Sequence, residues 1–190
     1  LSVSSPDNSV SYYVDCSATA PGEGTLDAPW NNLEAANALA LEPGNRLLLR
    51  RGSTCIGMLR PQGSGTEADP ILIGAYGDGA LPRIHAQGMY TAAVHIEDMS
   101  HIVVRDLELT NPGDVNDADL YRGLYLASVG STVSNIEIRD LYIHDVTSRV
   151  DFCCGKRGGA IIADSSFGVP EAQFDDILIE NNRIEDVGRS

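Results

Sequence analysis

Oxygen ligands are concentrated in the loop at residues 112–122, which reads PGDVNDADLYR. Asp114, Asn116, Asp117 and Asp119 fall within this short stretch, and hard oxygen donors at such density suit Ca²⁺. The glycine and the terminal glutamate of an EF-hand loop are absent, so a solvated acidic loop is the alternative interpretation. The pattern predicts a Ca²⁺ site formed by Asp114, Asp117 and Asp119.

A second loop, at residues 146–158, mixes charges of both signs and reads VTSRVDFCCGKRG. Lys156 and Arg157 are adjacent, and Asp151 lies shortly before them. A base beside a cation can take up a proton and stabilise the negative charge that develops. Arg122, at the end of the preceding loop, is expected to join this group, whereas ordinary surface ion pairs with Asp151 are the alternative.

A different chemistry requires two carboxylates that act as general acid and general base. Asp151 precedes the segment GAII at residues 159–162, and Asp164 follows it closely, so these two are the candidate pair. The chain contains 27 Asp and Glu residues, and each of these aspartates also fits a role in a turn.

The elements that must position these loops are visible as a repeat. HIVVRDLELTN begins at His101, NIEIRDLYIHD at Asn135 and DILIENNRIED at Asp176. In each copy apolar, often β-branched residues alternate with polar ones, which indicates a strand with one buried face. The spacing between copies differs, so we expect the loops to absorb the variation.

Each copy contains a polar residue in the same column between its two apolar groups, namely Asp106, Asp140 or Asn181. Asp and Asn tolerate left-handed backbone, so this column predicts a bend between two short strands. A shorter apolar segment precedes each copy, at residues 93–96, 123–126 and 159–162. About three strands in each repeat, with loops of unequal length, are typical of a solenoid.

Bulk composition narrows the possible functions. The chain has 190 residues, of which 43% are hydrophobic, and this predicts one domain with a continuous core. No apolar stretch approaches the roughly 18 residues of a membrane span. A net charge of −14 argues against binding to nucleic acid through phosphate contacts. The polar first residues contain no signal-peptide core, which fits a mature or recombinant form.

Four cysteines allow three pairings if all are oxidised. We favour Cys16 with Cys55, because both lie in the N-terminal segment and a disulfide would join its two ends. Four reduced thiols are the alternative. Cys153 and Cys154 are neighbours, which would form a strained ring or pair elsewhere, and the cysteine spacing does not fit a zinc finger.

The N-terminal segment has a different pattern from the repeat. Asn31 or Asn32 is a candidate N-cap for one short amphipathic helix, ended by Pro43 and Gly44. The apolar residues at helical spacing are Leu33, Ala36, Ala40 and Leu41. Strands are expected in SYYVDC, RLLLRRG and PILIGAYG, and a turn-rich loop in RPQGSGTEAD. Such a helix can shield the open end of a solenoid core.

The order YYVDC, APWNNLEAANAL, PGNRLLLRRG and GSGTEADPILIGAYG, followed by the repeat, resembles secreted right-handed parallel β-helix proteins of the pectate-lyase-like superfamily. This superfamily contains polysaccharide lyases and glycoside hydrolases. The resemblance implies an all-β, right-handed parallel β-helix with a short N-terminal capping α-helix. It also implies a secreted single domain over residues 1–190, with the cap and first coil in 1–69 and regular coils in 70–190.

The resemblance further implies a substrate groove along an exposed strand face, flanked by the two loops. In a lyase, Lys156 and Arg157 would supply base and cation, and Ca²⁺ would neutralise a uronate. In a hydrolase, the carboxylates would be Asp151 and Asp164. Tyr125 would stack on a sugar ring and His95 would bond to hydroxyls, although His and Tyr are also common on outer strand faces without a function.

The sequence stops directly after the third copy, without a capping segment. We therefore expect a longer natural protein, or a second chain, to complete the solenoid. The function expected is degradation of a polysaccharide by β-elimination or by hydrolysis, and the binding partner expected is a polysaccharide or oligosaccharide. The alternative is a non-catalytic carbohydrate-binding or surface-adhesion module, because the sequence contains no catalytic motif that decides the matter.

Overall fold

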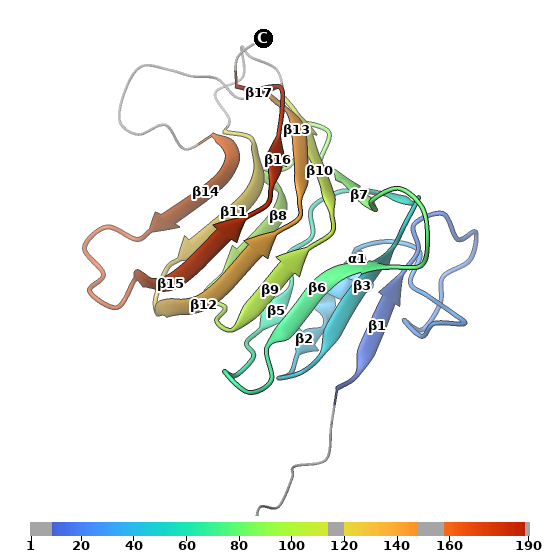
Figure 1. Ribbon diagram of the computed structural model, residues 1–190, viewed down its shortest axis with the longest axis horizontal. Coiled ribbons are helices and arrows are strands. Elements are labelled where there is room, and N and C mark those ends of the chain that lie inside the picture. Colours follow the sequence, from blue (N-terminus) through green and yellow to red (C-terminus); the bar gives the residue numbers. More distant parts are fainter. Residues whose placement is uncertain (1–8, 114–119, 148–157, 189–190) are drawn as a thin grey trace, which may run out of the picture.

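The computed structural model describes residues 9–113, 120–147 and 158–188 (Figure 1). Within these ranges the elements are strands, apart from one helix of five residues, α1 (Glu34–Ala38). Neighbouring strands pair in parallel, as the register of each sheet shows. The predicted all-β class is confirmed, and the described chain contains no helix long and apolar enough to cross a membrane.

The strands form three larger sheets and one small sheet. The first sheet contains, in order, β1 (Ser11–Val14), β3 (Arg46–Arg50), β6 (Ile71–Tyr76), β9 (Ile102–Arg105), β12 (Thr132–Arg139) and β15 (Gln173–Glu180). The second contains β4 (Thr54–Ile56), β7 (Arg83–His85), β10 (Glu108–Pro112) and β13 (Tyr142–Thr147), with β16 (Arg183–Ile184) and β17 (Val187–Gly188) both paired to β13. The third contains β8 (Ala92–Glu97), β11 (Arg122–Ser128) and β14 (Gly159–Ser165), and the small sheet pairs β2 (Ala40–Leu41) with β5 (Gln62–Gly63).

The chain visits the three sheets in turn, and three coils contribute one strand to each of them. β6, β7 and β8 form one coil, β9 to β11 the next, and β12 to β14 another. Figure 1 shows the strands of successive coils side by side, from β1 at one end to β14 and β15 at the other. The predicted solenoid with three strands in each repeat is confirmed.

The repeat columns stack as the sequence predicted. Ile136 lies opposite Ile102 on one side and Ile177 on the other, in matching register. Ile138 is fully buried, whereas Ile179, in the next coil of the same column, is 49% exposed. The alternating apolar residues therefore build the core, which is covered less completely at β15.

The bend predicted between two consecutive strands is also confirmed. Asp106, Asp140 and Asn181 have φ angles of +57°, +54° and +54°. An L-residue pays a steric cost in this left-handed region, which Asp and Asn tolerate better than most residues. The bend lets the chain pass from the first sheet to the second with one residue in this conformation.

The predicted disulfide between Cys16 and Cys55 is present, with a Cα–Cα distance of 5.1 Å. It joins the segment after β1 to strand β4, across 39 positions of the sequence. Cys153 and Cys154 lie outside the described residues, so their pairing stays open.

The N-terminal helix is shorter than predicted. The Asn32 side chain accepts a hydrogen bond from the Glu34 amide at 2.9 Å, as expected of a capping residue. Leu33 and Ala36 are buried as predicted, but the helix ends at Ala38, and Ala40 is an exposed residue of β2. Pairing of β2 with β5, inside the segment predicted as a turn-rich loop, competes with continuation of the helix.

Candidate functional site

The sequence-predicted site residues divide into two groups. Six of them lie outside the described residues, namely Asp114, Asp117, Asp119, Asp151, Lys156 and Arg157. The Ca²⁺ site and the base-and-cation pair therefore stay predictions. Among the described residues, His, Cys, Asp and Glu form no cluster of three or more that could hold a metal.

The other four residues come together on the third sheet. His95 pairs with Tyr125 across β8 and β11, and Glu97 and Asp164 pair with Ala127 from its two sides. Their neighbours in sequence, such as Val94, Leu124 and Leu126, are buried in the core. Because side chains alternate along a strand, the first set points to the outside. Arg122 has the strand phase of the buried Leu124, but its guanidinium lies over the Tyr125 ring. We therefore group it with the outward side chains, and call His95, Glu97, Arg122, Tyr125 and Asp164 the outer third-sheet face.

Tyr125 is the centre of this face. The Arg122 guanidinium lies 4.2 Å from the centroid of the Tyr125 ring, and the His95 ring lies 4.9 Å away at an angle of 45°. The Tyr125 hydroxyl donates a hydrogen bond to Asp164 Oδ2 at 3.3 Å. Arg122 is itself buried, so the cation is partly desolvated, and this strengthens its attraction to the ring. Arg122 and Asp164, predicted as catalytic, thus form one contiguous cluster with His95 and Tyr125, predicted as substrate-binding.

His95 presents a ring with unused hydrogen-bonding capacity. Its Nε2 atom is buried, has no hydrogen-bond partner among the described residues, and lies 3.4 Å from Glu97 Oε2. Burial lowers the pKa of His95, and the positive charges of Arg60 and Arg122 lower it further against the opposing effect of Glu97. A neutral imidazole is therefore expected near pH 7, with one nitrogen that donates and one that accepts.

Sequence reasoning missed Glu97 and Arg60. Arg60 binds Glu97 Oε1 through one guanidinium nitrogen at 2.8 Å, next to His95. Glu97 could have been found from the sequence, because it lies two residues after His95 and therefore faces the same side of the strand. Arg60 could not, because its segment joins β8 only at the isolated bridge between Leu59 and Val94.

Glu97 and Asp164 lie in one row, with the small side chain of Ala127 between them. Two strand spacings place their Cα atoms about 9.5 Å apart. The short side chain of Ala127 leaves space between the two acids on the outside of this row.

A cavity of about 360 Å³ adjoins the Asp164 end of the row. It is lined by Tyr125, Ala127, Ser128, Val129, Asp164, Ser165, Ser166 and Phe167. Phe167 is fully exposed beside these serines. Hydroxyls, a carboxylate and an aromatic ring together can bind both the polar edge and the apolar surface of a sugar.

The chain was compared with known proteins, and no protein-family model matches it. It is 27% identical to the lacto-N-biosidase of Bifidobacterium longum subsp. longum over an alignment of 231 positions, which covers 86% of this chain and 14% of that protein. The crystal structure of the GH136 lacto-N-biosidase from Eubacterium ramulus, as a selenomethionine derivative, matches with a TM-score of 0.83 and 26% identity. That match covers 94% of this chain and 34% of the enzyme.

The native crystal structure of the same enzyme gives the same TM-score and identity, and covers 95% of this chain and 36% of the enzyme. The chain thus spans about a third of the solved enzyme. Over nearly its whole length, it is similar in sequence and in fold to proteins named lacto-N-biosidases.

Proposed function

We propose that this chain is part of a glycoside hydrolase that acts on oligosaccharides, and that the outer third-sheet face binds the sugar. The observation that carries the proposal is the match with the GH136 lacto-N-biosidase, at a TM-score of 0.83 over 94% of the chain. Of the two reactions expected from the sequence, hydrolysis is the one named in these relatives. The chain spans 34% of that enzyme, so the activity of the whole protein is part of the proposal.

The face offers polar contacts more than a broad stacking surface. Arg122 covers one side of the Tyr125 ring, which limits the stacking predicted from the sequence. The Tyr125 hydroxyl and His95 Nε2 project from one row of the sheet, and the carboxylates of Asp164 and Glu97 project from the next outward-facing row. Carboxylates accept hydrogen bonds from sugar hydroxyls, and a neutral imidazole can donate one and accept another. Groups of this kind on neighbouring rows can bind neighbouring hydroxyls of a sugar.

The role of Asp164 follows from its contact. Its carboxylate accepts the hydrogen bond from the Tyr125 hydroxyl, which favours sugar binding and positioning of Tyr125 over proton transfer. Asp151, Lys156 and Arg157 stay candidate catalytic residues, because the chemistry assigned to them rests on the sequence alone.

Three broader features belong to the same proposal. We infer a right-handed winding, because parallel strands joined by crossovers follow that hand in about 98% of cases. We infer membership of the pectate-lyase-like superfamily from the parallel solenoid and the capping helix. We infer secretion, since a disulfide such as Cys16–Cys55 persists in oxidising compartments.

The test is hydrolysis of a panel of p-nitrophenyl glycosides that includes the lacto-N-bioside, with mass spectrometry of the products. Hydrolysis adds water and leaves a reducing end, whereas elimination leaves an unsaturated sugar that absorbs ultraviolet light. We expect Tyr125→Ala to raise KM about tenfold, a loss of about 1.4 kcal/mol of binding. Tyr90→Ala, at a partly exposed tyrosine outside the three sheets, is the matched control.

Equal kinetics for the two variants would contradict the assignment of the face. Binding of the glycosides by the wild-type protein without any turnover would instead favour the non-catalytic carbohydrate-binding module. Unsaturated products would restore the lyase alternative.

A further inference from the structure

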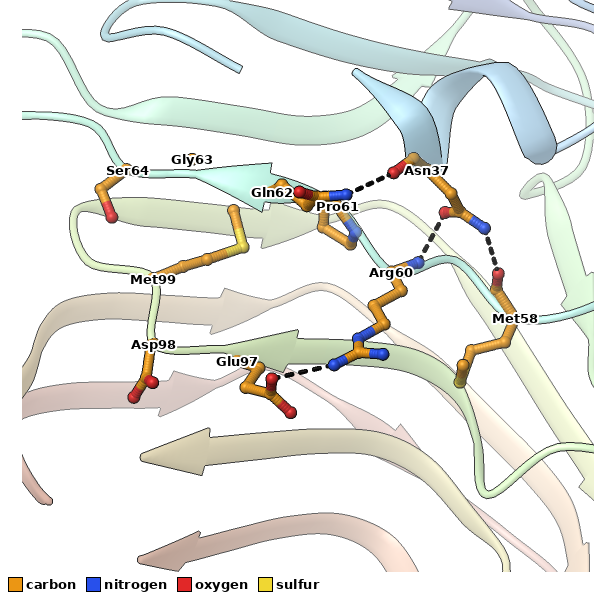
Figure 2. A pocket seen from close by; sticks show the side chains of 10 residues that line it. All are labelled: Asn37, Met58, Arg60, Pro61, Gln62, Gly63, Ser64, Glu97, Asp98 and Met99. Atoms are coloured by element: carbon orange, nitrogen blue, oxygen red, sulfur yellow. Dashed lines mark hydrogen bonds and ion pairs between the residues drawn. The ribbon is translucent and has the colours of Figure 1, made fainter. Parts of the chain in front are cut away.

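A second cavity, of about 650 Å³, lies at the other end of the outer third-sheet face (Figure 2). It is lined by Asn37, Met58, Arg60, Pro61, Gln62, Gly63, Ser64, Glu97, Asp98 and Met99. Figure 2 shows the side chains of Arg60 and Glu97 directed toward each other across the gap between the segment at 58–64 and strand β8. Its volume is within the range of about 300–1,000 Å³ that is usual for small-molecule sites.

The cavity exists because the segment at 58–64 leaves β8. Leu59 forms two backbone hydrogen bonds with β8, to the Ala93 carbonyl and from the His95 amide. The next residue in position to donate to β8 is Pro61, which has no N–H group. The chain then pairs as β5 with β2 instead, and the edge of β8 beyond His95 borders the cavity.

The wall formed by the segment at 58–64 is held in place by Asn37. Its side-chain amide donates to the Met58 carbonyl at 2.9 Å and accepts from the Arg60 amide at 2.7 Å. Gln62 Nε2 donates to the Asn37 carbonyl at 2.9 Å. These bonds fix the backbone from which Arg60 and Gln62 project, so the cavity is built before any ligand arrives.

The opposite wall is equally well fixed. Asp98 accepts hydrogen bonds from the backbone amides of Val129 at 2.8 Å and Gly130 at 3.2 Å. Burial alone would raise the pKa of Asp98, but these amides and Ser131 outweigh it and hold the pKa below its ordinary value. Asp98 is therefore an anion at neutral pH, and it holds the turn between β8 and β9 against the neighbouring coil.

The charged side chains that line the cavity favour a neutral ligand over an anionic one. Arg60 is compensated by Glu97, and Asp98 adds a second negative charge to the lining. A uronate or another anionic sugar would meet net negative charge here. A neutral pyranose would find the planar polar groups of Arg60, Gln62 and Glu97 for its hydroxyls, and the side chains of Met58 and Met99 for its apolar surface.

We propose that this cavity is an additional sugar subsite for a neutral pyranose unit of the oligosaccharide bound on the outer third-sheet face. Glu97 connects the two, because one carboxylate oxygen binds Arg60 and the other lies 3.4 Å from His95 Nε2. The inference rests on the proposed function and adds to it a requirement for a substrate that extends beyond the His95–Tyr125 row.

The experiment compares short and long substrates in the full-length protein and in Gln62→Trp. Gln62 is exposed at the cavity, so an indole there fills space while only one side-chain hydrogen bond is lost. Gln173→Trp is the matched control, because Gln173 is also exposed and also donates to a backbone carbonyl, that of Pro170, away from the cavity.

The probes are the p-nitrophenyl lacto-N-bioside and neutral oligosaccharides that carry the same unit within four to six sugars. We expect Gln62→Trp to raise KM for the longer probes about tenfold and to leave KM for the aryl glycoside within about twofold. Gln173→Trp should leave both unchanged. A similar change for short and long probes, or no change for either, would overturn the subsite.

Direct binding separates this inference from the proposed function. If the wild-type protein hydrolyses no probe, the hydrolase proposal fails, and titration of the neutral hexasaccharide followed by NMR still tests the subsite. Loss of binding in Gln62→Trp alone would support it. Absence of binding in the wild type, or tighter binding of an oligogalacturonate of equal length, would overturn it.

Discussion

The bend at Asp140 allows a sharp test of how the repeat determines the fold. Asp140 has a φ of +54°, a region that costs an ordinary L-residue about 1–2 kcal/mol. Its contact with Arg139, at 3.6 Å between partly exposed groups, contributes at most about 0.5 kcal/mol. The backbone conformation, more than the charge, should therefore determine which residues this position accepts.

We expect three substitutions to separate these contributions. Asp140→Asn keeps tolerance for the left-handed region and should cost less than about 0.5 kcal/mol. Asp140→Gly removes the steric cost but increases the entropy of the unfolded chain, so its net effect should be within about 1 kcal/mol. Asp140→Val places a β-branched residue at positive φ and should cost about 2 kcal/mol, which lowers Tm by about 4–8 °C in a chain of this size.

The assay is equilibrium unfolding in urea, followed by circular dichroism, with Asp140→Asn as the reference. The value of m should stay constant, because the buried surface does not change. If Asp140→Val and Asp140→Asn differ by less than about 0.5 kcal/mol, the steric argument is wrong. If Asp140→Gly is as unstable as Asp140→Val, the side chain and not the backbone conformation is what matters.

Three further predictions concern the site and the cap. Asp164→Asn should raise KM about tenfold and change kcat less than about threefold, because Asp164 positions Tyr125; a fall in kcat beyond about 100-fold would restore its catalytic role. Burial holds the pKa of His95 below 6.5, so its neutral form stabilises the fold above that pH, and this contribution is lost as the pH falls. His95→Gln should therefore flatten the decline of Tm between about pH 7 and pH 5, and an unchanged slope would contradict this. Replacing Cys16 and Cys55 by serine should lower the free energy of unfolding by about 4 kcal/mol, given a loop of 39 positions, and a loss below about 1 kcal/mol in urea would refute the estimate.

The repeat was predictable because two physical requirements coincide in it. Parallel stacking brings equivalent residues of successive coils into register, so Ile102, Ile136 and Ile177 must all be apolar. The bend after each strand needs left-handed backbone, which restricts Asp140 and its equivalents. A pattern that satisfies several constraints at once is readable without a structure.

The features that were not predicted from the sequence have a different origin. Strands β4 and β7 contain three residues each, too few to show alternation. The helix was predicted too long, because the local spacing of apolar residues carries no information about the pairing of β2 with β5. The segment that contains Arg60 is joined to β8 by a single isolated bridge. The ion pair between Arg60 and Glu97 therefore depends on tertiary structure and leaves no pattern in the sequence.

The candidate site lies where the regular stacking of strands and side chains on the third sheet is interrupted. On the third sheet, an unbroken succession of large outward side chains would leave no room for a ligand. Ala127 leaves a gap between Glu97 and Asp164, and Pro61 ends the pairing with β8 and opens the larger cavity. The repeat thus specifies which side chains face outward and how far apart they stand, while single departures from it create the space in which a sugar can bind. The same reasoning explains why the columns predict the fold well and the chemistry poorly, since an interruption at one position leaves no periodic signal in the sequence.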